Sequence, residues 1–397
     1  MKKMAYFEWL KIARDWKTRI LAIGFLVFFG TFSLLYRQQE VTLPEIQLRG
    51  EYADAQQIFR LIPESHFDGE LGEEVQRTLG RNATLIGLNQ YILGQQEGNT
   101  VAGIEDVVSD YLSNGRELAE NNLFLHETTE FESYELLKEV YLPTRAEVEK
   151  DLKFYSALEA NGLDIEWNPL ASSQILIQQV ELVTGVILFI FIALLAGDAF
   201  TKDQVKNCSV SQGLPIPWKK QWRLRSFMFW GIIWTVTLIG LAISYVVSLL
   251  FETTGTLQYP IEIFVDGASE YIPSWQYMLL VIGSGMLLSL VILLLTTGLS
   301  WIIRNIYLTI LIVIALYFAP AIWNSLPPLT AWQPSFYVNI QGILQGESAF
   351  QYGLDGLVFW KLPFILLGIW LLLEISFKQI FNLIPTQSLG LQRRKIK

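Results

Sequence analysis

Six long apolar runs constrain this chain more than any other feature of its sequence, because a helix needs about 20 apolar residues to cross the core of a bilayer. The first run carries no charge, and a polar stretch of well over one hundred residues separates it from the second. The sequence therefore predicts an α-helical membrane protein with six transmembrane helices. The expected spans are residues 20–36, 173–197, 226–251, 274–303, 305–323 and 357–381.

The composition excludes several other classes of protein. Charged residues make up 17% of the chain, against about 25% in an average soluble domain. The net charge of −9 argues against a nucleic-acid partner. The single cysteine, Cys208, cannot form an intrachain disulfide, and with only His66 and His126 the chain offers no zinc-site pattern. No small-x-small cleavage site follows the first run, so we expect an uncleaved membrane anchor rather than a signal peptide.

Lysine and arginine in the short flanking segments set the expected orientation. Residues 1–19 and the loop 198–225 carry six basic residues each, and the tail 382–397 carries four. The segments 252–273 and 324–356 carry none. We therefore expect both termini and the 198–225 loop in the cytoplasm, with residues 37–172 outside the cell.

The outer segment 37–172 is strongly acidic, with 26 Asp and Glu against 10 Lys and Arg. Its apolar spacing predicts a mostly helical extracellular domain, whereas residues 38–67 are less clear and a strand there is one possibility. Thr144 and Glu147 form a capping-box pattern at the start of the last helix, and Gly162 is a plausible stop. The acidic residues favour a solvated face, with an acidic surface for cationic peptides as the alternative. The expected helices are Glu70–Leu93, Val101–Phe124, Thr129–Val140 and Thr144–Ala160.

The first 19 residues predict an amphipathic helix that lies flat in the membrane interface on the cytoplasmic side. The alternative is a simple extension of the first span into the cytosol. The expected apolar face holds Tyr6, Trp9, Leu10, Ala13 and Trp16, and the polar face holds Glu8, Lys11, Asp15 and Thr18.

We expect a short polar helix in the loop 198–225, from about Thr201 to Ser211. Gly213 is expected to end it, because Pro215 and Pro217 would prevent its continuation. Because this helix joins two spans, a partner that displaces it moves both. The alternative is an ordinary inner loop that is basic only because of its topology.

These features together resemble the permease subunit of an ABC-2-type ABC transporter: six spans, an amphipathic start, a long outer insert and this loop. The family's loop pattern departs here at Asp203 and at residues 207–209, where a Glu and a Gly-Thr pair are usual. The matching loop residues are Asp198, Phe200, Leu214, Pro215, Ile216, Lys219 and Lys220. The outer stretches Leu326-Pro327-Pro328 and Gln333-Pro334-Ser335-Phe336-Tyr337 resemble the family's short re-entrant helices.

The resemblance implies energy from a separate chain, because this sequence has no Gly-x-x-x-x-Gly-Lys-Ser/Thr loop to hold a nucleotide. It implies a cytoplasmic dimer of ABC ATPase subunits that binds ATP and Mg, and a second permease chain, identical or related. This chain itself would bind no cofactor and no metal and would catalyse no reaction. The residues implied to contact the ATPase are Asp203, Gln204, Val205, Lys206, Asn207, Val210 and Leu214.

Ionisable and polar groups inside spans are costly and are therefore candidates for function. Glu181 and Gln178, in the second span, and Lys361, at the outer start of the sixth, are the candidates for translocation or gating. Glu181 is expected either to pair with Lys361, to face the pathway, or to reach the interface as an ordinary acid. Glu374 and Lys378 are spaced for an i,i+4 pair.

The function that follows is export of a hydrophobic or amphipathic substrate, such as a bacteriocin-like peptide, a toxin or a lipid-like molecule, across the plasma membrane of a bacterium. The alternative is a membrane sensor or assembly protein whose outer domain binds a ligand and whose inner loop signals. A secondary transporter is less well supported, because the sequence shows no repeated halves.

Overall fold

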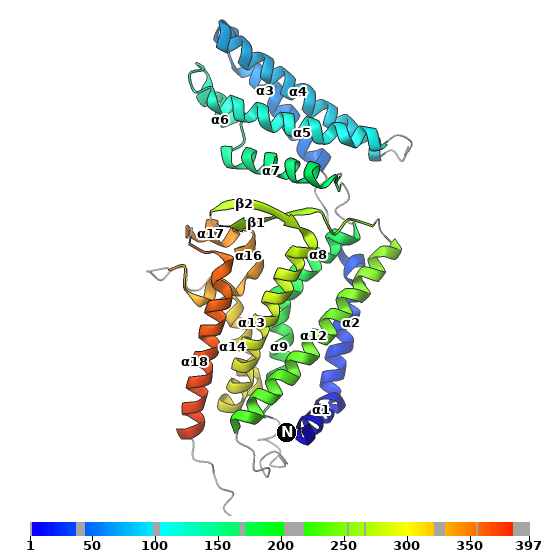
Figure 1. Ribbon diagram of the computed structural model, residues 1–397, viewed down its shortest axis with the longest axis vertical. Coiled ribbons are helices and arrows are strands. Elements are labelled where there is room, and N and C mark those ends of the chain that lie inside the picture. Colours follow the sequence, from blue (N-terminus) through cyan, green and yellow to red (C-terminus); the bar gives the residue numbers. More distant parts are fainter. Residues whose placement is uncertain are drawn as a thin grey trace, which may run out of the picture.

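The computed structural model describes residues 2–36, 44–97, 104–163, 165–166, 171–201, 218–251, 254–265, 267–320, 330–354 and 356–383. In these residues a bundle of long apolar helices carries a smaller helical domain at one end, and a β-hairpin lies between the two (Figure 1). We call the two ends of the bundle the domain end, next to the helical domain, and the loop end, where Thr201 and Trp218 lie.

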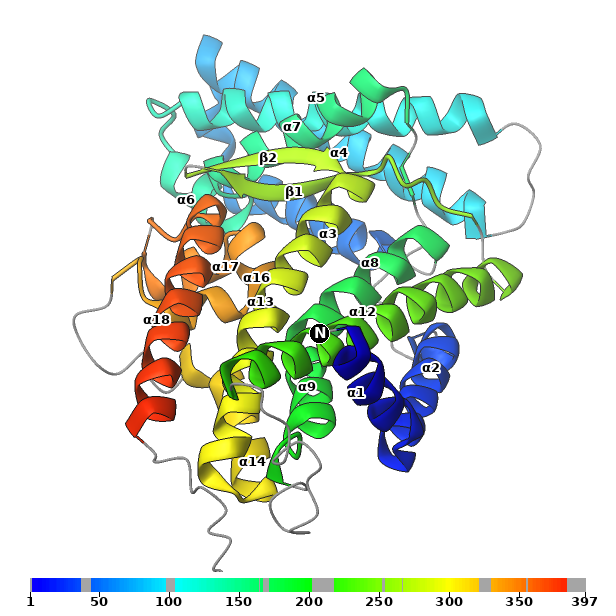
Figure 2. The same ribbon diagram turned by 60° about the horizontal axis from the view of Figure 1, so that its bottom comes forward.

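Five helices of the described residues are long and apolar enough to cross a membrane, which agrees with the predicted class of α-helical membrane protein. They are Trp16–Tyr36, Ser172–Ala196, Lys219–Leu250, Ser274–Ile303 and Phe359–Ile380. The second of these is the most central, with 67% of its apolar window buried, against 22% for the first and the last. Figure 2 shows α18 (Leu362–Leu383) and α2 (Trp16–Tyr36) on opposite sides of the bundle.

The central span is not a continuous α-helix. It consists of α8 (Ser172–Leu182), a π-helical turn η2 (Val183–Ile187) and α9 (Leu188–Ala196). Gly185 within this turn has φ −85° and ψ −135°, which lies outside the helical region. The central span packs beside α13 (Ser274–Ile303), which runs unbroken for 30 residues.

Two expected spans differ from the structure. In place of residues 305–323 the described helix is α14 (Ile306–Tyr317), whose 12 residues extend about 18 Å and fall short of a bilayer core of roughly 30 Å. The six-span count is therefore not confirmed. The third span begins earlier than expected, because α12 covers Trp218–Phe251 and includes four of the six basic residues that were assigned to the loop.

The domain formed by residues 44–163 is helical, as predicted. The expected capping box is present, since the Thr144 side chain and the Glu147 backbone and side chain pair reciprocally, and Gly162 ends the helix in the left-handed region. In the unclear stretch 38–67 the described part is helical rather than a strand. The elements are α3 (Pro44–Leu61), η1 (Glu64–Phe67), α4 (Glu70–Glu97), α5 (Ile104–Glu127), α6 (Tyr134–Val140) and α7 (Arg145–Asn161).

A β-hairpin joins this domain to the bundle. Strand β1 (Pro260–Val265) pairs antiparallel with β2 (Ala268–Pro273), which runs directly into α13. From α7, Lys150 forms an ion pair with Glu262 at 2.5 Å and Lys153 donates to the Ser269 carbonyl at 3.0 Å. The sequence prediction had only an outer loop here. The remaining short elements at the domain end are η3 (Pro334–Val338), α16 (Ile340–Leu344), α17 (Glu347–Tyr352) and η4 (Phe359–Lys361).

Small residues allow close helix contacts inside the bundle. A Cβ at Gly298 of α13 would lie 2.2 Å from the ring of Phe377 on α18, which is itself buried. A Cβ at Gly285 would lie 3.0 Å from Thr184, as expected for a residue at a helix contact, whereas Gly283 has no atom within 4 Å.

We predict that Gly298→Ala destabilises the protein by about 1–3 kcal/mol, because the added methyl forces α18 away from α13. Thermal unfolding of the purified full-length chain measures the effect. Gly283→Ala is the matched control in the same helix and should leave the midpoint almost unchanged. Equal midpoints for the two variants would show that the α13–α18 contact is loose.

Candidate functional site

Charged and polar side chains gather at the loop end of the bundle. A charge buried among apolar helices is strongly destabilising unless it is paired and hydrogen-bonded. The contacts described below connect α1 (Lys2–Arg14), the residues after α9, and the helices α12, α13 and α18. We refer to them as the loop-end network.

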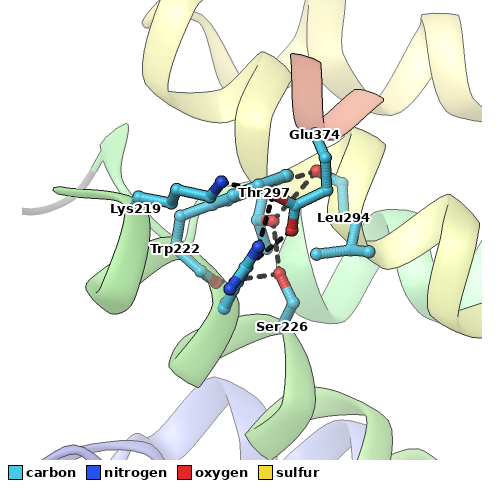
Figure 3. A network of polar contacts seen from close by, with 7 residues as sticks. Lys219, Trp222, Ser226, Leu294, Thr297 and Glu374 are labelled. Atoms are coloured by element: carbon cyan, nitrogen blue, oxygen red, sulfur yellow. Dashed lines mark hydrogen bonds and ion pairs between the residues drawn. The ribbon is translucent and has the colours of Figure 1, made fainter. Parts of the chain in front are cut away.

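Glu374 of α18 binds two basic residues of α12. Arg223 donates from Nε and Nη2 to its two carboxylate oxygens at 2.5 and 2.6 Å, and Lys219 Nζ lies 2.8 Å from Oε2 (Figure 3). This corrects the predicted Glu374–Lys378 pair. Because α12 begins at Trp218, its basic residues lie on helical turns beside α18, and the planar guanidinium fork makes a bidentate contact.

Arg225 and Glu8 form a second ion pair, and both side chains are only 2% exposed. Arg225 Nη2 donates to Glu8 Oε1 at 3.0 Å, and Nη1 donates to the Ala199 carbonyl at 2.7 Å. The guanidinium carbon lies 4.4 Å from the centre of the Phe200 ring. One arginine of α12 thus holds both helix α1 and the chain that follows α9.

Residues 198–201 have further contacts on either side. Lys17 Nζ forms an ion pair with Asp198 Oδ1 at 2.8 Å. The Thr201 hydroxyl donates to the Ser300 carbonyl at 3.1 Å, and the Phe200 amide donates to Ser300 Oγ at 3.2 Å. The segment that enters the 202–217 loop is therefore attached to α2 and to the end of α13.

The segment that leaves the loop is attached to the same helix. Trp222 Nε1 donates to the Leu294 carbonyl at 2.9 Å, and the hydroxyls of Ser226 and Thr297 lie 2.8 Å apart (Figure 3). Both ends of the 202–217 loop are consequently held on α13. The residues predicted to contact an ATPase, Asp203 to Leu214, lie outside the described residues.

Helix α1 presents an exposed aromatic face, with Tyr6, Phe7 and Trp9 open on its surface. Tyr6 and Trp9 belong to the predicted apolar face and Phe7 does not, and the location of this helix in the membrane interface stays a prediction. Glu8, which was assigned to the polar face, instead points into the bundle toward Arg225. The long-range partner of Glu8 could not be read from helical spacing alone.

A second polar group lies at the domain end, around Glu181 of α8. The carboxylate is buried, with 6% of the residue exposed, and it accepts from the Tyr277 hydroxyl at 2.6 Å. It also accepts from Gln341 at 3.0 Å and from Gln345 at 3.2 Å. These four residues, the Glu181 cluster, come from α8, α13, α16 and the residue that ends α16.

The Glu181 cluster lies directly before the π-helical turn. The Thr184 hydroxyl donates to the carbonyls of Val180 and Glu181 at 2.8 and 3.2 Å. π-helical turns frequently occur at functional sites, and Ser/Thr bonding back to the helix often bends it. The buried acid therefore sits beside the one described interruption of the central span.

The structure separates the predicted gating candidates. Glu181 is not paired with Lys361, whose ammonium donates instead to the Gly356 carbonyl at 2.7 Å. Gln178 is exposed, whereas its neighbour Gln179 is buried and donates to the Phe29 carbonyl at 3.4 Å. Sequence reasoning missed Tyr277, Gln341 and Gln345, because they lie in other elements and no local spacing links them to Glu181.

Nothing in the described residues resembles a metal site, since no group of three His, Cys, Asp or Glu side chains is placed to hold an ion. His66 contacts Ser133 and Glu132, and His126 contacts the Pro143 carbonyl, all within the helical domain of residues 44–163.

The fold and these two polar groups define an α-helical, multi-pass membrane protein with a separately folded domain at one end. No family model, curated protein or solved structure matches the chain.

We predict that Glu8→Ala destabilises the protein by about 3–5 kcal/mol, because it leaves the buried Arg225 guanidinium without its carboxylate. Denaturant or thermal unfolding of the full-length chain measures the loss. Glu139→Ala, an exposed acid of α6, is the control and should have little effect. A Glu8→Ala protein as stable as the control would mean that Arg225 is solvated in the native state.

Proposed function

We propose that this chain is the transmembrane permease subunit of an ABC exporter in the plasma membrane of a bacterium. In this proposal it moves a hydrophobic or amphipathic substrate outward, and a separate cytoplasmic dimer of ATPase subunits binds ATP and Mg and supplies the energy. The outer domain faces the exterior and the loop end faces the cytoplasm. A second permease chain completes the pathway.

One observation carries the proposal: both ends of the 202–217 loop are fixed to the bundle by short polar contacts. Asp198 to Thr201 bind α2 and α13, and the first turns of α12 bind α13 and α18. A force on the loop therefore acts on the spans rather than being absorbed by a slack connection. The resemblance of Asp198, Phe200 and residues 214–216 to the ABC-2 loop pattern supports the same assignment.

Glu181 is the gating residue of this proposal. Its carboxylate ties α16 to α8 and α13 on the outer side of the π-helical turn of the central span. Outward release of substrate requires these elements to separate, and the π-helical turn provides a place where α8 can move without displacing α9. The chain acts as a transport subunit and performs no chemistry on its substrate.

The contacts between α7 and the hairpin favour one other candidate, a membrane sensor whose outer domain signals through α13. The two candidates differ in their partner, because only the exporter requires an ATPase at the loop.

We predict that the full-length chain, purified from native membranes, carries a bound ATPase whose activity copurifies with it. Val205→Asp, Val210→Asp or Leu214→Asp should remove that subunit and its activity, because each places a charge in an apolar contact. Val205→Leu keeps the apolar contact and is the matched control. Retained ATPase activity in all three aspartate variants would reject the proposed coupling contact.

The location of the loop is tested on the same protein through its only cysteine, Cys208. A membrane-impermeant maleimide should label Cys208 only after the cells are permeabilised. A Cys208→Ser, Ser156→Cys variant, with the new thiol on exposed α7, should be labelled in intact cells. The reverse pattern would place the loop outside and reject both the orientation and the ATPase partner.

We predict that Glu181→Gln releases α16, because an amide brings its own N–H donors against the donors of Gln341, Gln345 and Tyr277. The reporter is Ile343→Cys in a Cys208→Ser background, since Ile343 is fully buried. Maleimide labelling from the domain side should accelerate at least tenfold. Glu374→Gln, the acid at the other end of the bundle, is the control. Unchanged labelling would show that apolar contacts alone hold α16, whatever the ATPase assay gives.

A further inference from the structure

Lys361 lies among exposed aromatic rings at the start of α18. Its ammonium is 5.0 Å from the ring centre of Trp332 and 5.5 Å from that of Trp360. The two indoles meet edge to face with their centres 6.2 Å apart, and they are 54% and 52% exposed. No carboxylate of the described residues forms an ion pair with Lys361, and neither indole N–H donates to a described residue.

Among the described residues from 254 to 383, Lys361 is also the only basic residue at the domain end of the bundle. The described residues between 254 and 383 include three basic side chains, and the other two, Arg304 and Lys378, lie at the loop end of α13 and α18. The Lys361 cluster, defined as Lys361, Trp332 and Trp360, therefore combines one cation with two indole N–H donors on an open surface.

An exposed apolar stripe continues from this cluster along α18. Its members are spaced three or four residues apart and so lie on one face of the helix. Trp360 lies in η4, directly before α18. Within α18 the stripe extends about 16 Å from Phe364 to Ile375 at 1.5 Å per residue, which is about one leaflet of a bilayer core of roughly 30 Å. The stripe consists of Trp360, Phe364, Leu367, Leu371 and Ile375.

We propose that the Lys361 cluster and this stripe form a binding site for one anionic phospholipid in the leaflet next to the outer domain. The lipid phosphate lies against the Lys361 ammonium and the indole N–H groups, and an acyl chain lies along the stripe. Tryptophan and lysine at a membrane interface suit this position, because the rings stay at the headgroup level while the charge meets the phosphate.

The geometry favours a lipid over a free anion, because the cation is continuous with an apolar surface of leaflet length. It also favours a lipid over a second copy of the chain. A contact between two copies of the chain here would bury the Lys361 ammonium. No carboxylate of the described residues on this surface could pair with it, so the desolvation cost would be high.

Native mass spectrometry of the purified full-length chain, titrated with phosphatidylglycerol or phosphatidylcholine, tests the proposal. Lys361→Gln should weaken phosphatidylglycerol binding about fivefold, which is the effect of one basic residue near an anionic surface, and should leave phosphatidylcholine binding unchanged. Lys138→Gln, which removes the same charge from exposed α6, is the matched control and should bind both lipids as the wild type does.

A second variant and a competition experiment identify the ligand. Leu371→Gln should weaken binding of both lipids, since it interrupts the stripe, and millimolar glycerol phosphate should not displace phosphatidylglycerol. Equal affinities of Lys361→Gln and wild type for phosphatidylglycerol would overturn the site. Displacement by glycerol phosphate would make it a site for soluble anions, and a wild-type dimer that binds lipid only after it dissociates would assign this face to a second copy.

Discussion

A charge placed in an apolar helix bundle must find a partner there, and this requirement organises the described part of the chain. The five candidate spans contain two acidic residues, Glu181 and Glu374, one near each end of the bundle. Each accepts hydrogen bonds from other elements, neutral donors for Glu181 and two basic residues for Glu374. Since breaking either set leaves polar groups buried without partners, the acids fix which helices stay together at each end.

The two ends are joined by helices of different stiffness. Helix α13 is unbroken and carries Tyr277 at the domain end and Ser300 at the loop end. The α8–α9 segment runs beside it and is followed by Asp198, but it is interrupted at Val183–Ile187, directly after the turn that carries Glu181. A displacement at the loop end is therefore carried along α13 as a rigid body, whereas α8–α9 can bend at the π-helical turn. The structure places the bendable point next to the buried acid rather than beside the loop.

Local signals in the sequence were sufficient to locate the five long apolar helices, though not the start of the third, and to place helix ends such as Thr144 and Gly162, because apolar length and capping depend on neighbouring residues. The hairpin also has a local signal that the prediction did not use. The dipeptide Asp-Gly at positions 266–267 is a sequence typical of two-residue hairpin turns, and it separates two runs of strand-forming residues. The charges of residues 252–273 were used to predict the membrane orientation, and the hairpin signal in the same residues was not used.

The candidate site was less accessible to sequence reasoning. Lys219 and Arg223 are far from Glu374 in the chain, and helical spacing offered Lys378 as a nearer partner for Glu374. Only the early start of α12 brings its basic turns beside α18, and the apolar window did not show that start, because basic residues lower the hydropathy of the first turns. The pairing of Glu8 with Arg225 was not predicted either, because the two residues are 217 positions apart in the chain and no local spacing links them.

The hairpin decides what the outer domain can do in the proposed exporter. Strand β2 continues without a break into α13, and α7 is attached to the hairpin through Lys150 and Lys153. Helix α13 also carries Tyr277 of the Glu181 cluster and the Ser300 contact of the loop-end network. A domain joined in this way to the helix that contacts both polar groups cannot move independently of them. A ligand that shifts α7 would therefore act on the same helix as a motor at the loop, from the opposite end, and the two effects on α13 would be thermodynamically reciprocal.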